Sequence, residues 1–336
     1  MLNTIGKGLY RILCAGALTL SAPGVANAAE YTMKMGTATV NDVQTYAMEQ
    51  YAKRVEEASG GRIETELYPA AQLGSNSRMI EGLQFGTLQY YTGPAAYLVG
   101  VDSRFQVTDA PGLFRDAEHA EKVFSDSEFR KAFLSLGNDK GLVVLGIYPY
   151  GETSFVTDFP PLTPETLEGK KVRVMASELE RKAVSSIGVT AVPIDFSEVS
   201  TALQQGTIDG VKTGARVFTS LKLYDIVDHL LITEEGIISE LMVVSKAWFD
   251  GLPPDLQKVL HEEARALEPD LWRYALADQE KAYREWEEQG GTVHRWDPDL
   301  RAKVAKNERD ASIEFLQSNE KTEEILDLIM KVAERY

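Results

Sequence analysis

Cysteine is almost absent from this 336-residue chain, and the only one, Cys14, lies near the start. Lys7 and Arg11 give the first residues a positive charge, a short apolar stretch follows, and Ala26-Asn27-Ala28 is typical of a signal-peptidase cleavage site. We therefore predict a signal peptide over residues 1–28 and a periplasmic protein. Because Cys14 leaves with that peptide, the exported chain has no disulfide and no thiol nucleophile.

Long hydrophobic runs and an excess of basic residues are also missing. No stretch reaches the roughly 20 apolar residues that a membrane-spanning helix needs, so we predict no direct membrane insertion. The formal net charge is −16, and loss of the two cations of the signal peptide, with no acid lost, leaves −18. Such an excess of acid disfavours binding to nucleic acid and to anionic membranes. It does not exclude a small anionic ligand, because one local arginine can bind it.

Common catalytic motifs are missing as well. The chain has no G-x-S-x-G, no H-E-x-x-H, and no glycine pattern of the kind that binds phosphates or dinucleotides. The four histidines are dispersed, at positions 119, 229, 261 and 294. The sequence therefore predicts no catalytic site, no metal site and no cofactor.

Residues 167–214 predict short strands alternating with short helices. Strands are expected near 170–175, 192–194 and 208–211, with helices over 179–187 and from the N-cap candidate Ser197 to Gly206. Such alternation favours a parallel sheet, and parallel sheets bind ligands beyond the carboxyl ends of their strands. Arg173 and Thr213 fall near two such ends, and Phe196 falls in a loop before a helix. These three residues are therefore candidates for ligand binding.

One pattern occurs twice in the chain. Residues 83–89 (LQFGTLQ) and 203–209 (LQQGTID) share four identical positions and pair a leucine with an isoleucine at a fifth. Each copy follows an N-cap candidate, Ser77 or Ser197, and leads from a helix through a glycine into a strand. Chance is one explanation. We interpret the repeat as two similar α/β lobes, each presenting a helix-glycine-strand corner to a shared cleft.

The chain is expected to cross between these lobes near Gly151 and to return near Glu240, between strands at 230–238 and 241–245. The helical periodicity from Leu256 to Gln289, interrupted only by Pro269, is long enough to span both lobes. Lobe I would then comprise residues 29–150 plus about 240–270, and lobe II residues 151–239 plus about 271–336. A single continuous sheet would contradict this organisation.

Five segments in order carry a resemblance that covers essentially the whole exported chain: residues 61–74, 113–120, 167–174, 196–210 and 245–249. The chain resembles the solute-binding proteins of TRAP (tripartite ATP-independent periplasmic) transporters. The resemblance implies an α/β fold with two lobes, a central cleft and a long helix spanning both lobes. It also implies that the lobes close on one small organic solute and deliver it to the membrane permease subunits of the TRAP transporter.

The resemblance also assigns site residues. In that family, the arginine of the strand after L-E/K-G-x-K pairs with a ligand carboxylate, and Arg173 holds that place here. A planar guanidinium with five donors suits a bidentate carboxylate. Where the family often has a second arginine, at the first crossover, this chain has Thr153, preceded by Glu152. Thr213 stands in place of a frequent asparagine, and Glu240 stands where an uncharged residue is common.

The full set of expected ligand-binding residues is Arg173, Phe196, Thr213, Thr153, Glu152, Glu240, Tyr91, Asn41 and Ser75. Further candidates for aromatic walls are Tyr90, Tyr148 and Tyr150. The family pattern favours a carboxylate-bearing solute. The alternative is an amine or zwitterion whose ammonium group faces Glu152 or Glu240 and the aromatic residues. We expect a monomer without enzymatic activity; an exported hydrolase and a sensory binding protein are less favoured alternatives.

Overall fold

The computed structural model describes residues 29–175 and 177–336, so the predicted signal peptide lies outside the described residues. Its first part forms three strands and two connecting helices: β1 (Tyr31–Gly36), α1 (Val43–Ala58), β2 (Ile63–Tyr68), α2 (Asn76–Phe85) and β3 (Tyr90–Pro94). β1 lies between β2 and β3 and is parallel to both. Met33 and Met35 alternate toward one face of β1 and share a core with Ala47 and Tyr51 of α1. This face therefore fixes how α1 covers the strands.

A second parallel group comprises β5 (Lys171–Val174), α5 (Glu178–Ser185), β6 (Thr190–Pro193), the 3-10 turn η5 (Phe196–Glu198), α6 (Val199–Gln204), β7 (Gly210–Gly214) and α7 (Ala215–Ser220). β5 lies between β6 and β7 and is parallel to both. The alternation predicted for this region is therefore confirmed. The expected cap is wrong: the Asp195 carboxylate accepts a hydrogen bond from the Ser197 amide at 3.1 Å, and α6 begins only at Val199.

The two repeated corners have the same hydrogen bonds. Gly86 after α2 and Gly206 after α6 have φ of 75° and 66°, and each amide donates to the carbonyl three residues earlier at 3.1 Å. The amides of Thr87 and Thr207 each donate to the carbonyl five residues earlier at 2.9 Å, which is a Schellman pattern. The repeat in sequence is thus a repeat in structure. The cap of α2 is Ser75, however, and not the expected Ser77.

Two long antiparallel strands, β4 (Leu142–Thr157) and β8 (His229–Ser245), join the two parallel groups. β8 pairs with β3 as far as Glu240, and β4 pairs with β7 from Thr153 onward. The order β2-β1-β3-β8-β4-β7-β5-β6 is therefore unbroken, with the unpredicted β9 (Thr292–Arg295) beside β8. Our expectation that no continuous sheet joins the lobes is wrong, because β4 and β8 belong to both. For the same reason the two strands expected around Glu240 are one.

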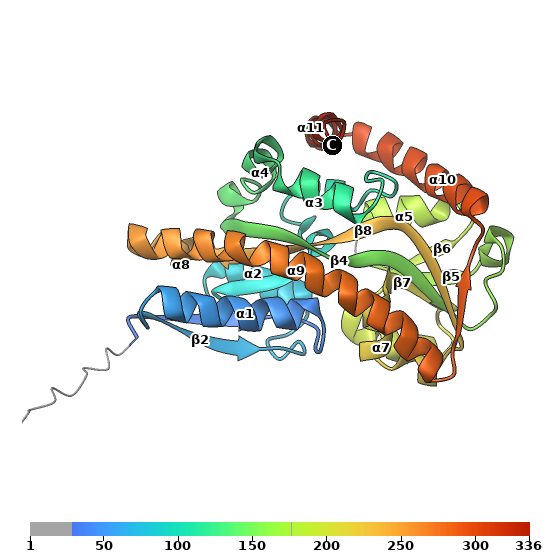
Figure 1. Cartoon of the computed structure of the whole chain (residues 1–336), viewed down its shortest axis with the longest axis horizontal. Helices are drawn as coiled ribbons and strands as arrows, with labels where there is room; N and C mark the ends of the chain where they lie inside the picture. The colour runs from blue at the N-terminus through green and yellow to red at the C-terminus, as the bar shows by residue number, and fades with distance from the viewer. Residues whose placement is uncertain (1–28, 176) are drawn as a thin grey trace, which may run out of the picture.

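The helix α9 (Pro254–Glu288) is a single 35-residue helix with Pro269 inside it. It packs against α1 at one end, along β4, and against α7 at the other end (Figure 1). Its side chains also hold β4: Glu268 accepts a hydrogen bond from the Ile147 amide at 3.1 Å, and Gln279 accepts one from the Glu152 amide at 2.6 Å. Both amides lie next to irregular pairings of β4 with β8. The predicted long helix that spans both lobes is confirmed.

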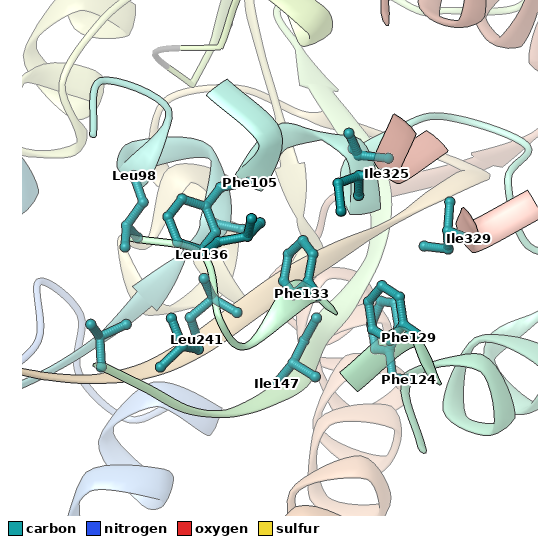
Figure 2. Packing of buried hydrophobic residues seen from close by; sticks show 14 of the residues in the cluster. Leu98, Phe105, Phe124, Phe129, Phe133, Leu136, Ile147, Leu241, Ile325 and Ile329 are labelled. Carbon is teal, nitrogen blue, oxygen red and sulfur yellow. The ribbon is translucent and has the colours of Figure 1, made fainter. Parts of the chain in front are cut away.

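The remaining helices are α3 (Ala117–Ser125), α4 (Ser127–Phe133), α8 (Lys246–Phe249), α10 (Pro298–Gln317) and α11 (Glu320–Ala333), with 3-10 segments η1 (Ala95–Leu98) and η2 (Ser103–Asp109). Figure 2 shows the core in which α3, α4, α11 and the two 3-10 segments pack, where Phe133 of α4 faces Ile147 of β4 and Leu241 of β8. Ile325 and Ile329 of α11 complete this core. The last helix therefore docks on elements from the first part of the chain.

Candidate functional site

A small cavity lies where the carboxyl ends of the parallel strands of both groups meet. The first group contributes Ala38, Thr39, Gln44, Asn76, Pro94 and Tyr97; the second contributes Arg173, Met175, Phe196, Thr213 and Val217; the shared strands contribute Tyr150, Ile238 and Glu240. This is the position that the parallel arrangement predicts for a ligand. Since both groups line it, a molecule inside would contact both lobes.

Arg173 supplies the positive charge of this cavity. It lies near the end of β5 and is only 2% exposed. Its Nε donates a hydrogen bond to the Ile194 carbonyl at 3.0 Å, and its Nη2 donates one to the Tyr97 hydroxyl at 2.9 Å. Within residues 29–175 and 177–336, no carboxylate forms a salt bridge with Arg173. The guanidinium is therefore oriented by neutral groups and keeps its charge available for an anion.

Glu240 of β8 also lines this cavity, and it is completely buried. Its Oε1 accepts a hydrogen bond from Gln44 Nε2 at 3.3 Å, and Gln44 Oε1 accepts one from the Thr37 hydroxyl at 2.6 Å. Oε2 has no hydrogen-bond partner among the described residues. Burial raises the pKa of Glu240 well above its usual value, and the nearby acids Asp42 and Asp109 raise it further. Both effects disfavour the charged form of this carboxyl group.

Tyr150 connects this wall to α1. Its hydroxyl donates a hydrogen bond to Asp42 Oδ2 at 3.0 Å, while Asp42 Oδ1 caps α1 by accepting from the Thr45 amide at 3.0 Å. Burial also raises the pKa of Asp42, although its hydrogen bonds oppose the shift. The cap of α1 and one aromatic wall of the cavity are thus held by the same carboxyl group.

Four of the nine expected residues line this cavity: Arg173, Phe196, Thr213 and Glu240. Tyr150 also lines it, whereas Tyr90 and Tyr148 are buried in the neighbouring core. Thr153 lines an adjacent cavity instead. There its hydroxyl accepts a hydrogen bond from the Gly236 amide at 3.2 Å.

Glu152, Tyr91, Asn41 and Ser75 lie outside the Arg173 cavity, each for a local reason. Glu152 is held by α9, because its Oε2 accepts a hydrogen bond from Gln279 Nε2 at 3.1 Å. Ser75 is used as the cap of α2. Asn41 has a φ of 56° and its carbonyl accepts a hydrogen bond from Arg216 at 2.9 Å.

Tyr91 acts one step away from the cavity. Its hydroxyl donates a hydrogen bond to Asn76 Oδ1 at 2.9 Å, and it is Asn76 that lines the wall. Sequence reasoning missed Asn76, Gln44 and Tyr97. A signal existed only for Tyr97, which follows the Gly93-Pro94 break at the carboxyl end of β3. Gln44 and Asn76 lie in the first turns of α1 and α2, where no pattern in the sequence separates them from capping residues.

Two features are absent from residues 29–175 and 177–336. In this part of the chain, no helix combines the length and apolar character needed to cross a bilayer. The same residues hold no group of three or more histidine, cysteine or acidic side chains arranged to bind a metal ion.

The sequence model of a family described as bacterial extracellular solute-binding protein, family 7 (DctP), matches residues 35–317. The chain belongs to this family. It is 29% identical over 286 residues to the 2,3-diketo-L-gulonate-binding periplasmic protein YiaO of Escherichia coli (strain K12), covering 84% of this chain and 86% of YiaO. It is 28% identical over 244 residues to the ectoine-binding periplasmic protein TeaA of Halomonas elongata, covering 69% of this chain and 72% of TeaA.

The fold is shared with solved members of the TRAP group. A TRAP periplasmic solute binding protein from Desulfovibrio salexigens, crystallised with orotic acid, superposes with a TM-score of 0.86. The two sequences are 24% identical, and the alignment covers 91% of this chain and 99% of that one. The resemblance to TRAP solute-binding proteins and the two-lobed α/β fold are therefore confirmed, with one sheet shared by both lobes through β4 and β8. Members of this family bind solutes outside the cytoplasm and serve transport, and the family is not one of enzymes.

Proposed function

We propose that this protein captures a small carboxylate-bearing solute in the periplasm and delivers it to the membrane permease of a TRAP transporter. Arg173 is the observation that carries the proposal. Its guanidinium is buried, lines the cavity and is oriented by Ile194 and Tyr97, and it forms no salt bridge among the described residues. A buried, unpaired cation costs free energy, and a bound carboxylate would remove that cost.

Burial raises the pKa of Glu240 well above its usual value, which weakens the negative charge that an ammonium group would need beside it. Glu152, the other acid considered for an amine, is held by Gln279 outside the cavity. The relatives agree in part: diketogulonate is a sugar acid, and ectoine is a zwitterion that also carries a carboxylate. A zwitterion could use Arg173 in the same way.

Closure of the two lobes on the solute is part of this proposal. Lobe I would contain residues 29–150 and about 240–270, and lobe II residues 151–239 and about 271–336, with α11 docked on lobe I. The part of β8 beyond its pairing with β3, around Ile238, and the part of β4 before its pairing with β7, around Gly151, would act as the hinge. A solute favours the closed form only through contacts with both lobes, and this cavity is lined by both. We further propose that the protein acts as a monomer and catalyses no reaction.

The test uses the solute that co-purifies with the protein, identified by mass spectrometry of the denatured sample. Calorimetry should then compare the wild type with Arg173→Ala and with Arg181→Ala, an exposed arginine on α5 that pairs only with Glu178. Arg173→Ala should cost about 2–5 kcal/mol, because a bound carboxylate would be left unpaired. That corresponds to about thirtyfold to several-thousandfold in affinity. Arg181→Ala should bind normally, and normal binding by Arg173→Ala would disprove the proposal.

A further inference from the structure

Two segments from opposite lobes meet at the rim of the Arg173 cavity. Thr39, in the loop before α1, lines the cavity from lobe I, and Val217 of α7 lines it from lobe II. Asn41 lies two residues after Thr39, and Arg216 lies directly before Val217. The Arg216 Nε donates a hydrogen bond to the Asn41 carbonyl at 2.9 Å. This hydrogen bond therefore joins the proposed lobes beside the cavity.

The acceptor, Asn41, lies in a turn that its neighbours hold in place. Its φ of 56° is in the left-handed region, which asparagine adopts more readily than most residues. The next residue, Asp42, is 1% exposed. It caps α1 by accepting from the Thr45 amide, and it also accepts a hydrogen bond from the Tyr150 hydroxyl. The Asn41 carbonyl is therefore fixed relative to α1 and β4.

The donor, Arg216, is held by two acids of α9. Its Nη1 lies 2.8 Å from Glu285 Oε2, and its Nε lies 3.3 Å from Asp278 Oδ2. The Arg216 side chain is only 12% exposed. A guanidinium has five N–H donors in a fixed plane, so it can bond the acids and the Asn41 carbonyl at the same time. Arg216 thus connects α7 and α9 in lobe II to the loop before α1 in lobe I.

A second arginine also crosses between the lobes, but it is the residue proposed to bind the solute. Arg173 of lobe II donates a hydrogen bond to the Tyr97 hydroxyl of lobe I at 2.9 Å. Arg216, by contrast, is not among the described residues that line the cavity. Its bond to Asn41 forms only when the lobes meet, so it favours the closed form without touching a solute.

We propose that Arg216 is a positioning residue for solute binding, which holds the two lobes together at the rim of the Arg173 cavity. This inference rests on the lobe closure of the proposed function. The apparent affinity for a solute depends on the fraction of protein in the form that binds it, so a bond that raises the closed fraction tightens binding. Loss of a hydrogen bond from a charged donor should lower the closed-to-open ratio about tenfold.

The test measures the distance between the lobes in protein that has been freed of solute by unfolding and refolding. Residues 29–336 contain no cysteine, so spin labels can be attached through Glu49→Cys on α1 and Thr201→Cys on α6, both at exposed positions. Pulsed electron paramagnetic resonance gives the closed and open fractions from the distances between the labels. The wild type should contain a closed fraction, and Arg216→Met should have an about tenfold lower closed-to-open ratio.

Arg216→Lys separates the bond between the lobes from the packing within lobe II. Lysine keeps a charge beside Asp278 and Glu285, but its single nitrogen cannot also hold the Asn41 carbonyl. Arg216→Lys should therefore open the lobes as Arg216→Met does, while it keeps the unfolding temperature of the wild type. If lysine restores both the closed fraction and the unfolding temperature that methionine lowers, the role of Arg216 is structural and the inference is wrong.

Arg295→Met is the matched control. Arg295 donates a hydrogen bond to Glu234 at 2.9 Å and lies over the Tyr283 ring, and all three residues belong to lobe II. Its loss should leave the closed-to-open ratio unchanged. The inference is also wrong if Arg216→Met keeps the distances of the wild type, if Arg295→Met opens the lobes as far, or if the wild type has no closed fraction.

These distance measurements use no solute, so they do not depend on the proposed carboxylate. Calorimetry with the co-purified solute, once it is identified, then tests the link to binding: Arg216→Lys should weaken binding by the factor by which the closed fraction falls. Unchanged binding by Arg216→Lys would overturn its role as a positioning residue. Normal binding by Arg173→Ala would instead overturn the proposed function and leave the bond between the lobes in place.

Discussion

The Arg173 cavity and the adjacent cavity, which Lys212 lines, treat their buried cations in opposite ways. Arg173 is oriented by a carbonyl and a hydroxyl and has no ion pair within the described chain. Lys212, which lies 39 residues further along the sequence, pairs with Glu235 and is flanked by Glu180 and Glu308. A buried charge that the protein leaves unpaired is available to a ligand, whereas a paired one holds elements together. The difference teaches that burial alone does not identify the binding residue.

The elements joined by Lys212 explain the stabilising role of its cluster. Glu180 comes from α5, Glu235 from β8 and Glu308 from α10, and each is nearly or completely buried. These elements lie far apart in the sequence, so the charges connect the last part of the chain to the second parallel group. Four variants test this contrast between a paired and an unpaired buried cation.

Lys212→Met should lower the free energy of unfolding by about 3–5 kcal/mol at pH 7, because it leaves buried acids without their cation. Lys171→Met is the matched control, since Lys171 is exposed on β5, and it should change stability by less than about 0.5 kcal/mol. Urea denaturation of both variants measures the difference. Equal stabilities would mean that the Lys212 cluster does not hold the fold together.

Glu308→Gln should flatten the pH dependence of stability. Burial raises the pKa of Glu308 to about 8, and Lys212 opposes the shift. Between the ordinary pKa of a glutamate and about pH 8, the Glu308 carboxyl group is therefore protonated in the folded state and ionised in the unfolded state. The stability that is present below the ordinary pKa is lost as the pH rises toward 8. The slope of the free energy of unfolding against pH should become less steep by up to about 1.4 kcal/mol per pH unit between pH 5 and 8.

The pKa values of other acids in this region shift in both directions, and burial raises the pKa of Glu180 as well, which keeps part of the slope in the variant. The pKa of Glu235 is lowered, so its contribution is lost only at acidic pH. The pKa of Asp109 is raised to about 7, so its titration still contributes part of the pH dependence of stability in the Glu308→Gln variant. An unchanged slope in Glu308→Gln would show that Glu308 does not take up the proton.

Arg173→Met should lower the free energy of unfolding by only about 1–2 kcal/mol, although it should strongly weaken solute binding. The variant loses the hydrogen bonds to Ile194 and Tyr97, but it also removes a buried charge without an ion pair. Denaturation without solute, compared with Lys212→Met under the same conditions, measures this. A loss as large as that of Lys212→Met would remove the contrast between the two cations.

Glu240→Gln should have the smallest effect, less than about 1 kcal/mol on solute binding at neutral pH. Burial raises the pKa of this carboxyl group well above its usual value and so disfavours its charge, and an amide keeps both the size and the acceptor that bonds Gln44. Calorimetry with the co-purified solute at pH 7 is the measurement. A loss of tenfold or more would indicate an ionised Glu240 and an ammonium group on the solute.

Site residues could be predicted from the sequence where they lie at the ends of regular strands. They could not be predicted where the pairing of the strands is irregular. Arg173 and Thr213 follow from the alternation of strands and helices, and both line the cavity. Around Glu152 and Thr153 the pairing of β4 with β8 shifts register, so alternation no longer tells which face a side chain takes. Glu152 is bonded by Gln279, which lies 127 residues away in the sequence.

The sequence by itself determined the local structure: the two glycine corners, the alternating strands and helices, the long helix and the arginine at a strand end. Short-range capping and periodicity produce these features, so nearby residues suffice. Which cations are paired, and which carboxyl groups have raised pKa values, depends on the folded chain. Only the tertiary structure decided that β4 and β8 make one continuous sheet. These depend on contacts such as Lys212 with Glu235 and Gln44 with Glu240, whose partners become neighbours only when the chain has folded.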